Sequence, residues 1–510
     1  MSKEMSRKKA SLISTIMGLI NSAITICLTF LIRTVVLREF GVEYVGLYSL
    51  LSQTIGILAG VDGGVSSALF IKMHKPIADN NIEEIHNSYF LIRVVYHIRG
   101  ILVLVIGMVV AFFLPQIANT SIDMSLVLSC YFAFLILNSF SYFFIYDYFM
   151  LETVQKRYVA SAVVCIVNLI VTAINIICVY KFHNYFVYIV ITSLNQIISY
   201  FVCRMVFRSI RKNFYKRLKF EKKHFQEILS LLGMAFHTFS NILITNSDTI
   251  IMSSLLSLVV TGYYANYYLI ITGVNTFAMQ LTLSIKDPFR NLAMTSSDDV
   301  AQINIKRIVF LYAIVVGAMG ITYSAMADFF VEIFWGSENI IVNQFTVYLL
   351  AISFYLNILS TPIVDYYYCK EYYRKDKISP IIEIVVNIVL SIVLAKLIGL
   401  DGIIIGTIVT YLYRFIHRSK IVYGKILNKN MREMLVIVIR SIVIYIIMSF
   451  GSRLIIREFV SNVSMLHFLI WAVIIFGFSL IVLCCFFVRE KEMKYYRAYF
   501  LEIMRNVIKR

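Results

Sequence analysis

Charged side chains are scarce in this chain. Only 15% of its 510 residues are Asp, Glu, Lys or Arg, whereas 60% are hydrophobic. Apolar stretches of about 20 residues recur throughout, and each is long enough to cross a hydrocarbon core roughly 30 Å thick. These stretches are continuously apolar, without the alternation of a membrane β-barrel strand. The composition therefore excludes a soluble globular protein and predicts an all-α, polytopic membrane protein.

Motifs of soluble catalysis are also missing. The chain has no Walker A sequence, no GxGxxG after a predicted strand and no HExxH. Its eight cysteines lie in apolar segments without disulfide or metal spacing, as expected of small hydrophobic side chains. The loops predicted outside the cell are short, which argues against a membrane glycosyltransferase or polymerase. We therefore expect no enzyme activity, no cofactor and no metal site.

About fourteen apolar segments are predicted to span the membrane. The N-terminal MSKEMSRKK leads into an apolar segment longer than a signal-peptide core, with no small-residue cleavage site, so we expect an uncleaved first helix. The predicted spans lie near 11–37, 44–70, 92–114, 123–150, 158–180, 184–207, 226–254, 258–285, 307–334, 340–368, 378–398, 401–422, 433–455 and 465–488.

Positive charge is distributed unevenly between the loops. The formal net charge is +18, and the cations cluster at alternate ends of the apolar segments, which is the positive-inside pattern. Anionic membrane lipids, and no nucleic acid, are the expected counter-charge. Both termini are therefore predicted to be cytoplasmic. The charges that do not fit this assignment are Arg38, Lys181, Lys396, Arg453 and Arg457.

A basic segment, RSIRKNFYKRLKFEKKH at 208–224, separates two similar halves. At an offset of 219, Glu152 pairs with Glu371, and at an offset of 216, Gly46 pairs with Gly262. The matches indicate duplication of a six-helix unit with both copies in one orientation, although shared membrane-helix composition is an alternative explanation. The predicted parts are an N-terminal bundle (1–207), a cytoplasmic linker (208–224), a C-terminal bundle (225–425), an additional helix pair (426–488) and a basic cytoplasmic tail (489–510).

Ionisable residues inside apolar segments are candidate functional residues, because each costs at least about 2.5 kcal/mol at the bilayer centre. Arg33, in TFLIRTVVLREFG, either faces a cavity and pairs with an anionic group or extends to the membrane interface. Asp62 lies among glycines in LAGVDGGVSSA. It either lines a cavity or is paired near the inner end of its helix, and we expect the cavity.

The predicted span at 226–254 is unusually polar. His237, Asn241 and Asp248 fall at i, i+4 and i+11, which is one stripe of a helix. A wet cavity wall explains the stripe, and so does packing through hydrogen bonds between helices. We expect the cavity wall, with His237 hydrogen-bonded and not acting as a proton carrier.

Four residues are candidates for a gate or hinge. Glu152 and Glu371 end their segments beside Lys and Arg, as expected of a salt-bridged helix end or inner gate edge. Pro362 frees a carbonyl and can kink the helix that carries Asp365, so this pair is a candidate hinge.

Two runs carry a resemblance to a known family. The run from Arg33 through REFGVEYVGLYSLLSQTIGILAGVDGGVSSAL resembles the first two helices of polysaccharide repeat-unit flippases, in the multidrug/oligosaccharidyl-lipid/polysaccharide exporter superfamily. The run ITNSDTIIMSSLLSLVVTGYYANYYLI is similar to helices seven and eight of that family, where an Asp precedes an apolar turn and Gly-Tyr begins the next helix. By layout, the resemblance extends over the first twelve segments. The last two resemble the extra helix pair of peptidoglycan-precursor flippases and of some polysaccharide exporters.

The resemblance implies two six-helix bundles around a cavity that opens alternately to either side. The implied cargo is an undecaprenyl-diphosphate-linked oligosaccharide, moved across the bacterial cytoplasmic membrane for capsule, O-antigen or similar polysaccharide. Cavity cations would hold the diphosphate, and Arg33 matches such a position. The sequence departs from this pattern because its spans hold few other candidate cations. Polysaccharide polymerase and glycosyltransferases are the implied partners.

Other functions compete with the flippase. A drug/ion antiporter of the same superfamily needs a strict ion site, for which Asp62 or Asp248 is the candidate carboxylate. A non-transporting membrane protein of polysaccharide assembly is a further alternative.

Overall fold

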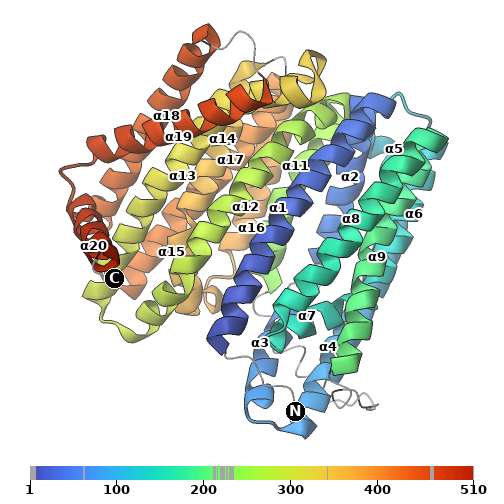
Figure 1. The fold of residues 1–510 in the computed structure, drawn as a ribbon, viewed down its shortest axis with the longest axis horizontal. Coiled ribbons are helices and arrows are strands. Elements are labelled where there is room, and N and C mark those ends of the chain that lie inside the picture. The colour runs from blue at the N-terminus through green and yellow to red at the C-terminus, as the bar shows by residue number, and fades with distance from the viewer. Residues whose placement is uncertain are drawn as a thin grey trace. The chain divides into compact units, whose positions relative to one another are not determined.

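The computed structural model describes residues 7–60, 64–210, 214, 216, 218, 224, 228, 235–341, 343–459 and 464–508. Every secondary-structure element in the described residues is a helix (Figure 1). Helices overlap all fourteen predicted spans, and eleven of the described helices are long and apolar enough to cross a membrane. The predicted all-α, polytopic membrane fold is confirmed.

The chain forms two compact units. One contains Met1–Ala265 and Lys377–Ile388, and the other contains Asn266–Asp376 and Val389–Arg510. These units are groups of residues in mutual contact, and they do not test the predicted domain boundaries, which stay predictions.

In the first unit, long apolar helices pack along their sides. α1 packs on α8, α8 and α6 on α9, and α2 on α11. Gly41, with φ at 91°, lets α1 turn into α2 through one residue, a conformation that L side chains rarely adopt. The helices are α1 (Arg7–Phe40), α2 (Val42–Ala59), α3 (Val65–Ala78), α4 (Ile82–Ala111), α5 (Leu114–Ile117), α6 (Met124–Ser141), α7 (Ile145–Thr153), α8 (Arg157–Phe182), α9 (Tyr185–Ile210) and α11 (Ala235–Leu255).

The loop after α5 is joined to the turn between α11 and α12 (Leu258–Thr295). The Asn119 backbone N–H donates to the Ser253 carbonyl (3.1 Å), and its side-chain Nδ2 donates to the Leu256 carbonyl (2.6 Å). The Leu258 N–H donates a hydrogen bond to the Asn119 carbonyl (2.9 Å). One asparagine therefore satisfies several backbone groups of that turn.

Gly46 and Gly262, which the sequence repeat pairs, pack against each other's helices. A Cβ on Gly46 would lie 1.9 Å from the Leu258 carbonyl oxygen, and one on Gly262 would lie 2.1 Å from the Val42 carbonyl oxygen. Gly46 contacts the carbonyl four residues before Gly262, and Gly262 contacts the carbonyl four residues before Gly46. The contact is thus reciprocal, and it requires residues without a side chain.

Three predicted spans are each divided into two helices. The span at 44–70 becomes α2 and α3, that at 123–150 becomes α6 and α7, and that at 340–368 becomes α14 (Gln344–Leu359) and α15 (Thr361–Cys369). α7 and α15 are both nine residues long and begin 216 residues apart. Gln155 and Glu371, at the same offset, both have positive φ. The geometry supports the duplication.

The geometric offset corrects part of the sequence alignment. It pairs Glu371 with Gln155, whereas the sequence match at 219 pairs Glu371 with Glu152. A shift of three residues is close to one helical turn, so it leaves the apolar pattern nearly unchanged. Composition alone therefore did not distinguish the two offsets.

In the second unit, α13 is largely buried and packs on α14, α18 and α19, which lie beside it in Figure 1. Arg453 on α18, which did not fit the positive-inside pattern, is buried and pairs with Asp328 on α13. The Tyr267 hydroxyl donates to Asp328 (2.7 Å). The remaining helices are α13 (Asp298–Trp335), α16 (Ser379–Ile398), α17 (Leu400–Lys420), α18 (Arg432–Phe459), α19 (Met465–Phe486) and α20 (Lys491–Ile508).

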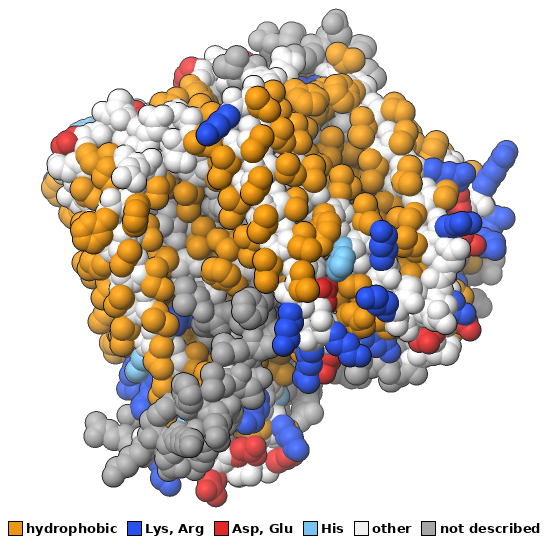
Figure 2. All heavy atoms as spheres, turned by 180° about the vertical axis from the view of Figure 1, so that it is seen from behind, with side chains coloured by type: hydrophobic (Ala, Val, Ile, Leu, Met, Phe, Trp, Pro, Cys, Tyr) orange, Lys and Arg blue, Asp and Glu red, His pale blue; other side chains and the backbone are white. Residues whose placement is uncertain are grey.

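The exposed surface is largely apolar. Figure 2 shows hydrophobic side chains over much of one face, with Lys and Arg gathered away from the widest hydrophobic area. Val473 on α19 and Val385 on α16, for example, are 71% and 53% exposed. Such surfaces are stable against lipid tails and not against water.

Candidate functional site

A polar cavity lies inside the first unit, enclosed by α1, α2, α8 and α9. Its volume is about 170 Å³. Arg33 is the one Lys or Arg among the described lining residues, and none of these is Asp or Glu. The lining residues are Thr25, Leu28, Thr29, Ile32, Arg33, Val36, Val45, Tyr48, Asn168, Val171, Thr172, Asn175, Tyr188, Thr192 and Asn195.

Helical periodicity directs the polar side chains into this cavity. Thr25, Thr29 and Arg33 are spaced four residues apart on α1. On α8 the polar lining positions are 168, 172 and 175, and on α9 they are 188, 192 and 195. Both sets follow the i, i+4, i+7 spacing, which places residues on one face of a helix. Three helices thus each contribute one polar stripe to a common space.

Arg33 is a half-buried cation, and the described lining of its cavity includes no carboxylate. Its Nη1 atom is buried and donates no hydrogen bond to any described residue. The rings of Tyr48 and Tyr188 line the same space. A buried charge is costly unless it is paired and hydrogen-bonded, so this guanidinium favours an anionic group or water in the cavity.

Amide and hydroxyl groups supply the rest of the cavity's polarity. Asn175 donates through Nδ2 to the Thr192 hydroxyl (2.9 Å) and to the Tyr188 carbonyl (3.4 Å). The Oδ1 atoms of Asn175 and Asn195 are buried and accept no hydrogen bond from the described protein atoms. The two amide oxygens can accept hydrogen bonds from hydroxyls, and the Arg33 Nη1 atom can donate to a negatively charged group. The cavity therefore suits a ligand that carries both hydroxyls and negative charge.

Of the other predicted cavity residues, His237, Asn241 and Asp248 are not among the described lining residues. Asp62 lies outside the described residues. On α11, His237 and Asp248 are buried, whereas Asn241 is exposed. Their role in a cavity wall stays a prediction.

Hydrogen bonds between helices account for part of the polarity of α11. The Ser240 hydroxyl donates to the Pro380 carbonyl (3.0 Å), and the Ser247 hydroxyl donates to Asn387 Oδ1 (3.1 Å). Both acceptors lie in the first half of α16, within the same unit. Helix packing, which was one explanation of this polar sequence, is therefore present for its serines.

The predicted gate and hinge residues lie at helix ends and breaks. Glu152 pairs with Arg157 (3.1 Å), and Glu371 pairs with Arg374 (3.2 Å). Pro362 is in the first turn of α15, directly after the break at Ser360, and Asp365 is buried one turn later. Their function as a gate or hinge stays a prediction.

Sequence reasoning missed several buried arginines. It expected few candidate cations besides Arg33, but Arg414 and Arg418 on α17 are buried, and Arg204 on α9 approaches the fully buried Asp147 (3.8 Å). The Tyr89 hydroxyl also donates to Asp147 (2.6 Å). Because these arginines are near the segment ends that the sequence predicts to be cytoplasmic, charge counting treats them as topology signals. The i, i+4 spacing of Arg414 and Arg418 is the sequence signal that could have shown that they share one face of a helix.

Comparison with solved structures shows where this fold occurs. The lipid II flippase MurJ, in an inward closed conformation, is similar with a TM-score of 0.57 and 14% identity, over 94% of this chain and 99% of that one. An inward-facing multidrug resistance MATE family transporter of the MOP superfamily is similar with a TM-score of 0.55 and 12% identity, over 79% of this chain and 94% of that one. A MATE transporter from Vibrio cholerae is similar with a TM-score of 0.54 and 11% identity, over 82% of this chain and 99% of that one. At these identities the likeness establishes the fold alone, which the chain shares with these transporters.

Comparison of the sequence with protein families identifies one of them. No curated protein matches the chain. The family model described as polysaccharide biosynthesis protein matches residues 9–283, more than half of the chain and all of the helices that enclose the Arg33 cavity. The chain therefore belongs to the polysaccharide biosynthesis protein family.

Proposed function

We propose that this protein is a flippase that moves an undecaprenyl-diphosphate-linked oligosaccharide across the bacterial cytoplasmic membrane for envelope polysaccharide synthesis. The observation that carries the proposal is Arg33, whose buried Nη1 atom lies in a cavity with no carboxylate among its described lining residues. Membership of the polysaccharide biosynthesis protein family supports this class of cargo.

The chemistry of the cavity suits part of such a cargo. Diphosphate and sugar hydroxyls do not enter hydrocarbon without partners, because their lost hydration is expensive. Arg33 offers charge-assisted hydrogen bonds to phosphate or a sugar acid, and Asn175 and Asn195 offer acceptors to hydroxyls. The cavity of about 170 Å³ would provide these groups to the charged part of the cargo.

We assign the other candidate residues to the movement of the cargo. Asp62, His237, Asn241 and Asp248 would form further wall of the pathway. The helix break before Pro362 provides a hinge near the buried Asp365, while the ion pairs of Glu152 and Glu371 would hold helix ends in one state. Alternating access by rocking of repeated helical bundles then exposes the cargo to either side.

The proposed setting follows from the charge distribution and the family. Positive-inside loops orient both termini to the cytoplasm of a bacterial cell. Polysaccharide polymerase and glycosyltransferases would use or supply the same lipid-linked sugar. Anionic lipids would surround the basic loops.

A drug/ion antiporter is the second candidate, because MATE transporters share the fold. An antiporter that exchanges cations needs a carboxylate in its ion site. The described lining of the Arg33 cavity carries positive charge instead, which favours an anionic ligand.

The test is translocation of a lipid-linked oligosaccharide in proteoliposomes that contain the purified protein. Arg33→Ala should lower the initial rate about tenfold or more, since hydrogen bonds to a charged group contribute about 1.5–3 kcal/mol. Arg33→Lys should be intermediate, because it keeps the charge and loses the forked donor geometry. Arg38→Ala, at an exposed position on the same helix, is the matched control. Equal rates for Arg33→Ala and Arg38→Ala would contradict the proposal, as would cation-coupled drug export without lipid translocation.

A further inference from the structure

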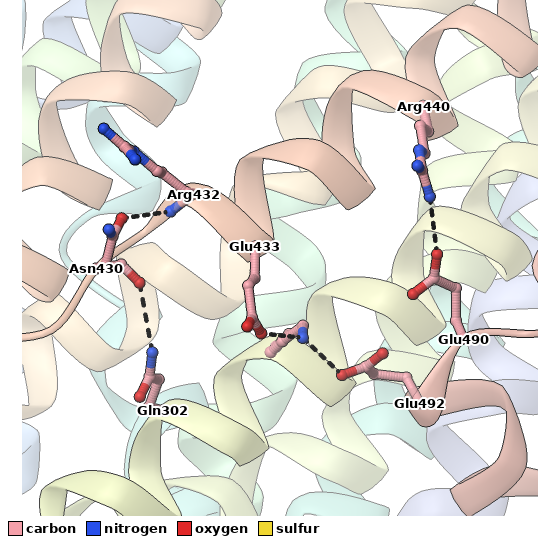
Figure 3. Close-up of polar contacts among 8 residues, drawn as sticks. Gln302, Asn430, Arg432, Glu433, Arg440, Glu490 and Glu492 are labelled. Atoms are coloured by element: carbon pink, nitrogen blue, oxygen red, sulfur yellow. Dashed lines mark hydrogen bonds and ion pairs between the residues drawn. The ribbon is translucent and has the colours of Figure 1, made fainter.

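A second pocket lies in the other unit, where α13, α18 and α20 begin (Figure 3). Its volume is about 600 Å³. Four of its described lining residues are cationic and two are carboxylates, which leaves a net charge of +2. The lining residues are Gln302, Ile303, Lys306, Arg307, Asn430, Arg432, Glu433, Lys491 and Glu492.

One lysine pairs with both carboxylates of this pocket. Lys306 Nζ lies 2.7 Å from Glu433 and 3.1 Å from Glu492. Figure 3 shows the side chains of Glu433 and Glu492 converging from different helices. Lys306 therefore connects the first turns of α18 and α20 to α13.

The other three cations form no ion pair with any residue that the structure describes. Arg307 is held against the Tyr495 ring, with its guanidinium carbon 3.5 Å from the ring centroid. Arg432 and Lys491 are exposed, and Arg432 points away from the Glu433 side chain in Figure 3. Arg432 and Lys491 are also the first residues of α18 and α20, where the helix termini add partial positive charge.

An apolar stripe runs along α18 from this pocket. Val436, Ile439 and Val443 stand four, seven and eleven residues after Arg432, so all four share one face of the helix. These three side chains are 45%, 58% and 52% exposed. A free phosphate has no apolar surface to bury against this stripe, whereas an acyl chain buries apolar area against it.

We propose that this pocket binds the phosphate of an anionic membrane phospholipid, with Arg432, Lys491 and Arg307 as the cationic partners and the α18 stripe as the acyl-chain contact. α20 fits this position because it is strongly amphipathic, with Tyr495, Tyr499 and Leu501 exposed. Such a helix lies along the membrane interface with its apolar side toward the acyl chains. The site is independent of the cargo proposed for the Arg33 cavity.

The experiment measures lipids that stay bound to the purified full-length protein, by native mass spectrometry after exchange into mixed phosphatidylglycerol and phosphatidylcholine. The wild type should retain phosphatidylglycerol selectively. The double variant Arg432→Gln/Lys491→Gln should lower its affinity about tenfold or more, because each cation near an anionic lipid surface contributes about a fivefold factor. Lys494→Gln, exposed on α20 and outside the pocket, is the matched control and should retain the wild-type affinity.

Three outcomes would overturn the proposal. Equal retention of the two lipids by the wild type would remove the headgroup selectivity. Equal loss of phosphatidylglycerol in Lys494→Gln and in the double variant would show attraction to general surface charge. Complete displacement of phosphatidylglycerol by millimolar inorganic phosphate would identify a free-phosphate site. Thermal unfolding of each variant at the wild-type temperature establishes that the pocket is folded.

Discussion

Single buried charges show how this chain tolerates ionisable residues among apolar helices. Arg453 is buried on α18, pairs with Asp328 on α13, and lies 5.2 Å from the Tyr348 ring centroid. Tyr267 completes the group through its hydrogen bond to Asp328. Arg33 differs because the described lining of its cavity supplies no carboxylate. The same residue type is thus structural in one place and available for a ligand in the other.

Removal of one partner of the Arg453–Asp328 pair should destabilise the protein strongly. Asp328→Ala is expected to lower the free energy of unfolding by about 3 kcal/mol or more, because it leaves a buried guanidinium uncompensated. The double variant Asp328→Leu/Arg453→Met should recover most of the loss. Denaturant unfolding of the purified protein measures both.

An exposed ion pair on the same helix is the control for that effect. Arg440→Met breaks the pair with Glu490 and should cost less than about 1 kcal/mol. If the Asp328 single and double variants were equally unstable, lost packing and not the uncompensated charge would be responsible.

Close contacts between helices depend on glycines, which a hydropathy profile does not distinguish from other residues. α2 and the start of α12 approach so closely at Gly46 and Gly262 that a Cβ on either would overlap a backbone carbonyl. Backbone cannot rotate away as a long side chain can, so any substitution must separate the helices. These two glycines therefore set the distance between their helices.

Alanine at these glycines should loosen the contact. We expect Gly46→Ala and Gly262→Ala each to lower the stability by about 1–3 kcal/mol through overpacking. Gly477→Ala on α19, where a Cβ meets nothing within 4 Å, should be neutral or slightly stabilising. Thermal unfolding compares the three, and an unchanged midpoint for Gly46→Ala would contradict the close approach.

α20 should depend on Lys306 for its attachment to the rest of its unit. Lys306→Met removes the ion pairs to Glu433 and Glu492, and it leaves Glu492 buried without its cation. Chymotrypsin should then cut at Tyr495 severalfold faster than in the wild type. Lys429→Met, which breaks the pair between Lys429 and Asp299 (2.6 Å), is the control and should leave the rate unchanged. Equal cleavage rates in the two variants would show that apolar contacts alone hold α20.

For the molecule as a whole, hydropathy predicted the class of fold because a membrane helix needs a long apolar run. It did not predict the break before α7, where Tyr142–Phe144 contains no proline or glycine. The break before α15 coincides with Pro362, which has no N–H to donate to the carbonyl four residues earlier.

The candidate site was predictable in its charge and not in its polar lining. An arginine in an apolar run is conspicuous, and Arg33 lines the cavity. Thr25, Asn175 and Asn195 were missed because single Thr and Asn residues are common in membrane helices. Only the shared spacing on α1, α8 and α9 distinguishes them, and that spacing becomes informative once the helices are known to be neighbours.

The central claim is that the protein carries a lipid-linked oligosaccharide to the outer leaflet. The most direct measurement is the leaflet distribution of that lipid in cells depleted of the protein and complemented with wild type, Arg33→Ala or Arg38→Ala. The account predicts that depletion traps the lipid-linked sugar in the inner leaflet, that wild type and Arg38→Ala restore outward movement, and that Arg33→Ala does not. Unchanged outward movement in depleted cells would contradict it.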